Sequence, residues 1–232
     1  MSAIVRKKDH SAREHRSDGP RLDDPRVVRT RAAVVDAART LFLRQGYSGT
    51  TMEEIAALAG ITKRTMYNNY ADKAALFTQI VGDFMAFAEA FAQGLPQEFA
   101  DDVTAATLAV TLDDLARRMA TAILRPEVIA LRRLLIRESG AFPNLGAEYF
   151  ERAPRQVIEA LAKEFASLDK AGVLHLSDAR RAAAQFAYLV VGEPLDRAML
   201  LGAIPPEDEV IACARDGVRT FLARYADRGA RD

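Results

Sequence analysis

The sequence predicts an all-α protein of about nine helices, with an N-terminal three-helix helix-turn-helix unit followed by a larger helical domain. Half of the 232 residues are hydrophobic and only 7% are aromatic, a composition that suits packed helices better than a sandwich or a barrel. Apolar residues recur at spacings of three and four along most of the chain. Glycine and proline fall between these stretches, where helices end.

The formal charge is zero overall but is unevenly distributed. Residues 1–73 carry 14 Lys and Arg against 9 Asp and Glu, whereas residues 74–232 carry 18 against 23. A basic unit on an acidic body suits a phosphate-binding domain joined to a regulatory one. We expect 1–25 to be a flexible charged tail, because it has no apolar periodicity. We also expect a cytoplasmic protein without membrane contact, since no long apolar run or signal-peptide core is present.

The first two helices are expected at residues 29–44 and at about 50–60. Leu41 and Phe42 lie on the apolar face of the first, and Gly46 ends it because glycine tolerates the left-handed cap conformation. The second begins at a capping box, formed either by Thr50 and Glu53 or by Thr51 and Glu54. Gly60 ends this helix.

A third helix is expected from about 62 to 70, with Thr62 as its N-cap. Two short helices joined by so tight a turn must cross steeply, as in a helix-turn-helix. Ile61, Met66 and Tyr70 would anchor the third helix in the core. The polar residues between them would then face outward.

These outward side chains suit the reading of DNA. Arg64 can form two hydrogen bonds with guanine and Asn68 two with adenine, Thr65 can contact either base edge, and Lys63 can bind a phosphate. Tyr67 suits a phosphate or a sugar of the DNA. Thr51 and Lys73, each near the start of a flanking helix, can bind the DNA backbone. The candidate DNA-binding residues are Thr51, Thr62, Lys63, Arg64, Thr65, Tyr67, Asn68 and Lys73. Periodicity alone is equally compatible with a solvated surface helix.

A family resemblance favours the DNA-binding interpretation. Residues 29–76 resemble the N-terminal DNA-binding domain of the TetR family of bacterial transcriptional regulators. The resemblance is carried in order by the pairs Gly46-Tyr47 and Thr50-Thr51, the turn Ala59-Gly60-Ile61-Thr62, the pair Met66-Tyr67, Tyr70 and Lys73. Arg64 and Asn68 replace a frequent glycine and histidine. The resemblance implies a homodimer on a pseudopalindromic operator, controlled by a small-molecule effector.

The rest of the chain is expected to form helices at about 72–93, 103–123, 126–139, 145–171, 178–201 and 206–226. Gly94 to Asp102 interrupts the pattern, Ser177 is the expected N-cap of the fifth of these helices, and Pro154 and Pro194 are expected to kink the helices that contain them. Residues 131–150 also resemble C-terminal domains of AefR-like members of the TetR family. The expected domains are 26–73 for DNA binding and 74–228 for effector binding and dimerisation.

The resemblance further implies an effector cavity and a dimer interface. Apolar residues on the helices that the family wraps around its cavity are the candidates for binding a largely apolar effector: Phe84, Phe87, Met119, Ile123, Leu131, Leu135, Phe142, Tyr149 and Phe186. Packing in an ordinary core explains the same residues. The last two long helices would pair across the two-fold axis, although an internal core gives the same apolar stripe.

Enzymatic chemistry finds little support in the sequence. His10, His15 and His175 have no partners at useful spacing, no catalytic or phosphate-loop motif is present, and Cys213 alone cannot form an internal disulfide. We therefore expect no catalytic residues, metal site or cofactor. Two other functions remain open: a TetR-like nucleoid or DNA-binding protein without small-molecule control, and a helical adaptor.

Overall fold

The computed structural model describes residues 25–99 and 103–226, so the expected tail lies outside the described residues except for Pro25. The described residues form ten α-helices, one π-helical turn and no strand, which confirms the all-α prediction. The α-helices are α1 Pro25–Gln45, α2 Met52–Leu58, α3 Lys63–Asn69, α4 Lys73–Glu98, α5 Leu108–Ile123, α6 Pro126–Arg137, α7 Pro143–Phe150, α8 Gln156–Lys170, α9 Ala179–Leu201 and α10 Glu207–Tyr225. The π-helical turn η1 Glu151–Arg155 joins α7 and α8 without a break, so the described helical segments number the expected nine.

The three N-terminal helices follow the local signals of the sequence. Gly46 has a φ of +85° and donates its N–H to the carbonyl of Phe42, ending α1. The capping box of α2 uses Thr51 and Glu54, the second of the two expected pairs. The N-cap of α3 is Thr62, whose hydroxyl accepts a hydrogen bond from the N–H of Thr65, as expected.

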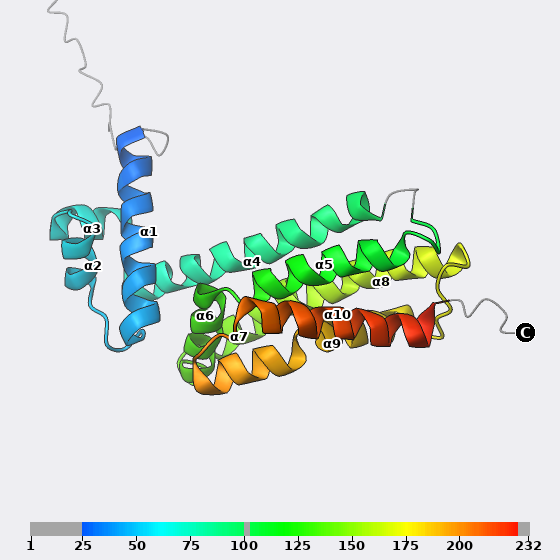
Figure 1. Ribbon diagram of the computed structural model, residues 1–232. Coiled ribbons are helices and arrows are strands. Elements are labelled where there is room, and N and C mark those ends of the chain that lie inside the picture. The colour runs from blue at the N-terminus through cyan, green and yellow to red at the C-terminus, as the bar shows by residue number, and fades with distance from the viewer. Residues whose placement is uncertain (1–24, 100–102, 227–232) are drawn as a thin grey trace, which may run out of the picture.

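The long helix α4 runs from the N-terminal unit into the body (Figure 1). The interruption expected from Gly94 onward is wrong, because α4 continues through Pro96 to Glu98. Leu95 is fully buried and holds this last turn on the core. α4 is also long and apolar enough, by length and composition, to cross a membrane. Core helices of folded domains have the same property, and α4 packs against α8 and η1.

Two further expectations concerned the body helices. Pro154 lies in η1, where its missing N–H removes a hydrogen bond from the helical ladder and the widened π turn absorbs the defect. Ser177 is not the N-cap of α9. Asp178 caps this helix by accepting the N–H of Arg181 at 2.9 Å, since a carboxylate one residue later is better placed for the first turn.

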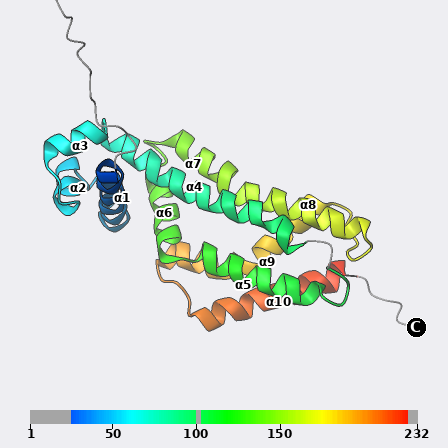
Figure 2. The same ribbon diagram turned by 90° about the horizontal axis from the view of Figure 1, so that it is seen from above.

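The buried side chains form two clusters. The front core combines α1, α2, α3 and the first half of α4 with residues of α6, α7 and η1. The rear core combines the end of α4 with α5, α6, α8, α9 and α10. Seen from above, α7 and α8 flank α4 on one side and α5 and α10 on the other (Figure 2). The N-terminal helices therefore rest on one end of an elongated helical body.

Candidate DNA-binding surface and internal cavity

Helix α3 turns its polar side chains outward. Met66 is fully buried and Tyr70 is nearly so, whereas Lys63, Arg64, Tyr67 and Asn68 are exposed. Thr65 is half-buried, and its hydroxyl lies 2.9 Å from that of Thr62. The structure therefore brings the expected α3 residues together on one surface that can enter a major groove.

The two cations of this surface differ in their surroundings. Lys63 Nζ lies 3.3 Å from Glu53 on α2, in an exposed ion pair that a phosphate could replace. Arg64 has no carboxylate within ion-pair distance in the part of the chain that the structure describes. Its guanidinium is therefore available for a bidentate contact with a base.

Thr51 and Lys73 flank the α3 surface but have internal partners. The hydroxyl and the N–H of Thr51 both bond Glu54. Lys73 Nζ donates to the carbonyls of Tyr47 and Thr50, both at 2.8 Å, and lies 4.3 Å from the centre of the Tyr47 ring. One N–H of the ammonium remains for another acceptor. Lys73 thus anchors the loop before α2, a role that its sequence position did not indicate.

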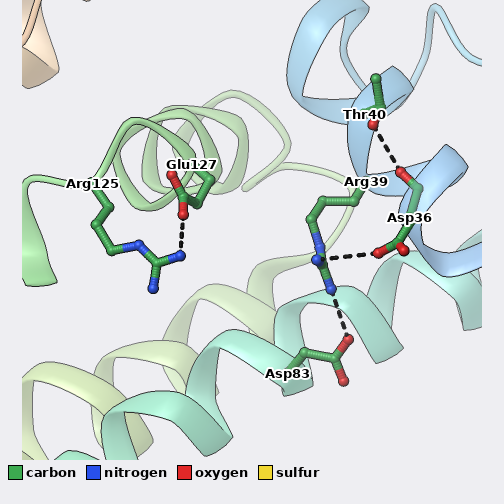
Figure 3. A network of polar contacts seen from close by, with 6 residues as sticks. All are labelled: Asp36, Arg39, Thr40, Asp83, Arg125 and Glu127. Carbon is green, nitrogen blue, oxygen red and sulfur yellow. Dashed lines mark hydrogen bonds and ion pairs between the residues drawn. The ribbon is translucent and has the colours of Figure 1, made fainter. Parts of the chain in front are cut away.

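A polar link connects α1 to α4 (Figure 3). Arg39 Nη1 lies 3.5 Å from Asp36 on its own helix, and Nη2 lies 3.3 Å from Asp83 on α4. The guanidinium also lies 5.8 Å from the centre of the Phe84 ring. Because Phe84 belongs to the wall of the cavity described next, Arg39 connects that wall to α1.

The body contains a cavity of about 110 Å³. Five of the expected effector-binding residues line it: Phe84, Phe87, Met119, Ile123 and Tyr149. The wall is otherwise mainly aliphatic and aromatic, with Arg132 as its only charged residue among those described. Phe87 and Tyr188 are 46% and 60% exposed, so the cavity opens to solvent on their side.

The other four expected residues do not line this cavity. Leu131 and Leu135 pack in the front core, because their side of α6 faces the N-terminal helices. Phe142, just before α7, packs against the same core through the rings of Tyr47 and Phe77. Phe186 is fully buried in the rear core, in contact with the rings of Phe165 and Phe221. Helical spacing identified these residues as buried but could not tell which neighbour each would face.

The cavity lies between the two cores. Tyr149 and Ala153 of its wall belong to the front core, and Phe84 packs against that core. Met119 and Val191 belong to the rear core. A molecule that enters the cavity therefore contacts both cores at once.

Comparisons with known proteins agree with this architecture. A family model described as the C-terminal domain of AefR-like transcriptional repressors matches residues 110–227, slightly more than half of the chain. A second, described as bacterial regulatory proteins of the tetR family, matches residues 34–80. The chain belongs to the TetR family. It is therefore a DNA-binding transcriptional regulator, and the resemblance inferred from the sequence is confirmed.

Individual TetR-family relatives resemble different parts of the chain. A TetR-family regulator from Mesorhizobium loti MAFF303099 has a TM-score of 0.76 and 27% identity, over 86% of this chain and 98% of that one. The flavonoid-responsive regulator FrrA has a TM-score of 0.63 and 31% identity, over 87% of this chain and 100% of that one. The repressor BepR of Brucella suis is 38% identical over 56 residues. That match spans 24% of this chain and only 27% of BepR, about a quarter of each.

Proposed function

We propose that this TetR-family protein is a ligand-responsive repressor, which binds a pseudopalindromic operator as a homodimer and is released by a largely apolar small molecule. The position of the cavity between the front and rear cores carries the proposal. The front core holds α3, so a ligand that separates or rotates the cores changes the position of the DNA-reading helix. FrrA, whose name states a response to flavonoids, supports a small-molecule effector.

On DNA, α3 would enter the major groove. Arg64 would read guanine and Asn68 adenine, while Thr65 contacts a base edge and Lys63 exchanges Glu53 for a phosphate. Thr62 and Tyr67 would contact the sugar-phosphate backbone, and Lys73 would use its remaining N–H there. Thr51 would contact it by turning its hydroxyl from Glu54 to a phosphate. The protein would act on this operator in the bacterial cytoplasm. No catalytic step is part of the proposal.

Two contacts would pass the signal from the cavity to α3. Phe84 carries a displacement of the cavity wall to Arg39 and so to α1. Helix α6 carries Arg132 toward the cavity and Leu131, Leu134 and Leu135 into the front core. In a dimer, the two copies of α3 must match major-groove faces about 34 Å apart or a multiple of it. A small rotation of α1 and α3 would therefore suffice to weaken binding.

Dimerisation is assigned to the outer faces of α9 and α10. Leu189 and Leu200 are exposed on one face of α9, at 37% and 72%. Phe221 of α10 is fully buried within the protomer and so cannot contribute. The proposed boundary between residues 73 and 74 divides the chain by function and not by packing, because the front core contains residues from both sides of it. Charges placed at Leu189 and Leu200 should give monomers in sedimentation, and persistent dimers would move the interface elsewhere.

Fluorescence anisotropy on the DNA upstream of the protein's own gene tests the proposal, with a scrambled duplex of equal length as control. We expect specific binding at physiological salt with two protomers per site. Arg64→Ala should cost about 1–3 kcal/mol and relax preference at one base pair. Arg117→Ala, which removes an equal charge from α5, should leave affinity unchanged.

Other results would point to other functions. Specific binding that no compound entering the cavity relieves would indicate a DNA-binding protein without small-molecule control. Equal and salt-sensitive binding to both duplexes would require a genome-wide search for the operator. Absence of any DNA affinity on sites so selected would contradict the proposal.

A further inference from the structure

Resting on the proposed function, we propose that the cavity is built for a small aromatic anion, whose carboxylate or phenolate oxygen is bound by Arg132 and Tyr149. The charge of the wall, the hydrogen-bond donors that it presents and the shape of its apolar part all favour this class of effector.

The charge of the cavity wall is positive and uncompensated. Arg132 is half-buried in this wall, which contains no Asp or Glu among the described residues. Its guanidinium has no carboxylate within ion-pair distance in residues 25–99 and 103–226. Glu89 and Glu148, which adjoin the wall residues Ala88 and Tyr149 in the sequence, are both paired with Arg152, at 2.7 and 2.8 Å. A cation partly removed from water without a counter-charge favours an anionic ligand.

The polar groups of the wall are hydrogen-bond donors. Arg132 Nε donates to the hydroxyl oxygen of Tyr149 at 3.3 Å, which leaves the two Nη groups of the guanidinium for a ligand. The Tyr149 hydroxyl accepts this bond and keeps its own hydrogen to donate. Two converging donors of this kind suit an oxygen that carries negative charge, because charge-assisted hydrogen bonds are the stronger ones.

The apolar part of the wall suits a flat ring. Phe84, Phe87 and Phe91 contribute aromatic faces and edges, and Met119 adds a polarisable sulfur. At about 110 Å³ the cavity is comparable to the roughly 150 Å³ engineered cavity that binds benzene, so it has room for one ring and not for two. A single ring with its anionic group at Arg132 is therefore the natural occupant, and larger molecules would extend through the opening beside Tyr188.

Three probes of nearly equal size and shape test the charge preference. Benzoate, benzamide and benzamidine are planar and carry a negative, neutral and positive group respectively. Their affinities for the full-length wild-type protein would be measured by isothermal titration calorimetry without DNA. We expect benzoate to bind about tenfold more tightly than benzamide, and benzamidine to bind least. Equal affinities, tighter benzamide or benzamidine binding, or no benzoate binding at millimolar concentration would overturn the inference.

Variants assign the preference to Arg132. Arg132→Met should remove the advantage of benzoate over benzamide while benzamide binding persists. The control is Arg133→Met on the same helix, because Arg133 faces Met199 outside the cavity and should retain the preference. If Arg132→Met does not fold, Tyr149→Phe takes its place. This substitution removes only the hydroxyl and should reduce benzoate affinity severalfold. Benzoate preference that survives both substitutions would overturn the assignment.

This experiment separates the inference from the proposed function. Ligand affinity is read without DNA, whereas repression is read from operator binding by the ligand-free dimer. A protein that binds its operator but shows no anion preference keeps the proposed function and loses the effector class. Preference for benzoate without specific DNA binding would support the anion site and contradict the proposed function as a repressor.

Discussion

The front and rear cores use similar aromatic packing to hold different parts of the molecule. In the front core, Phe42, Tyr47, Phe77 and Phe142 contact one another with ring centres 4.9–5.7 Å apart and join α1, α4 and the segment before α7. In the rear core, Phe165, Phe186 and Phe221 are 5.1–5.5 Å apart and join only body helices. The front cluster therefore joins the N-terminal unit to the body, whereas the rear cluster holds the body helices together.

The largest expected effects test this division. Phe77→Ala and Phe165→Ala each remove a fully buried ring and should each lower the free energy of unfolding by about 3–5 kcal/mol. Only Phe77→Ala should also weaken operator binding by the folded protein, because Phe77 contacts Phe42 of α1 and Tyr47. Thermal unfolding and anisotropy measure the two effects.

The comparison requires both variants to be folded dimers. Sedimentation verifies the dimer, and Phe77→Leu and Phe165→Leu repeat the test at smaller cost if the alanine variants do not fold. Equal losses of DNA affinity in the two variants would show that the cores act as one unit. The proposed route from cavity to DNA would then lose its physical basis.

Gly217 marks a close approach of two rear-core helices. A Cβ at this position on α10 would lie 2.6 Å from the carbonyl oxygen of Leu189 on α9, and backbone cannot move aside cheaply. Gly217→Ala should therefore lower the free energy of unfolding by about 1–3 kcal/mol. Gly94→Ala is the control, since its Cβ meets nothing within 4 Å inside α4 and should stabilise by up to about 1 kcal/mol. Urea denaturation of the two variants would decide, and unchanged stability for Gly217→Ala would mean that α9 and α10 separate easily.

Lys73 has two candidate roles in the N-terminal unit. Its ammonium holds the loop before α2 through the carbonyls of Tyr47 and Thr50, and its remaining N–H could bind a DNA phosphate. Lys73→Met removes the donors to two carbonyls and should destabilise the protein by about 1–2 kcal/mol. If the remaining N–H binds a phosphate, the salt dependence of operator binding should also fall by about one ion. Unfolding and anisotropy at several salt concentrations separate the two roles. An unchanged salt slope would remove Lys73 from the DNA-binding residues.

The two regions also differ in how far the sequence predicts them. The caps at Gly46, Thr51 and Thr62 are encoded by residues within one turn, so they could be read before any tertiary contact was known. The cavity wall is assembled from helices far apart in the chain. Phe84 and Phe186 have the same apolar character and helical spacing, yet only Phe84 lines the cavity. The face that each residue presents depends on helix packing, which a local pattern does not contain.

Arg132 illustrates the same limit from the polar side. The sequence groups Arg132 with Arg133, Arg137 and Glu138 on one predicted helix, where the cluster could bind an ionic effector but more often indicates solvated surface. In the structure only Arg132 of this group lines the cavity. The packing of α6 against α1, α7 and α9 selects it, and no spacing within α6 distinguishes it from its neighbours.

The smallest expected effect concerns the capping box of α2. Thr51→Ala removes the side-chain cap and should cost about 1 kcal/mol, whereas Thr51→Ser keeps the hydroxyl and should cost less.

The hydrogen bond from the Thr51 N–H lowers the pKa of Glu54 below its ordinary value of 4.5. The folded protein therefore gains stability from ionised Glu54 above that value and loses it as pH falls through the lowered pKa. The wild type should lose this contribution in acid, and Glu54→Gln should show a flatter acid limb in urea denaturation monitored by circular dichroism. Identical acid limbs would mean that the box frays in solution, and the orientation of α3 would then depend on the front core alone.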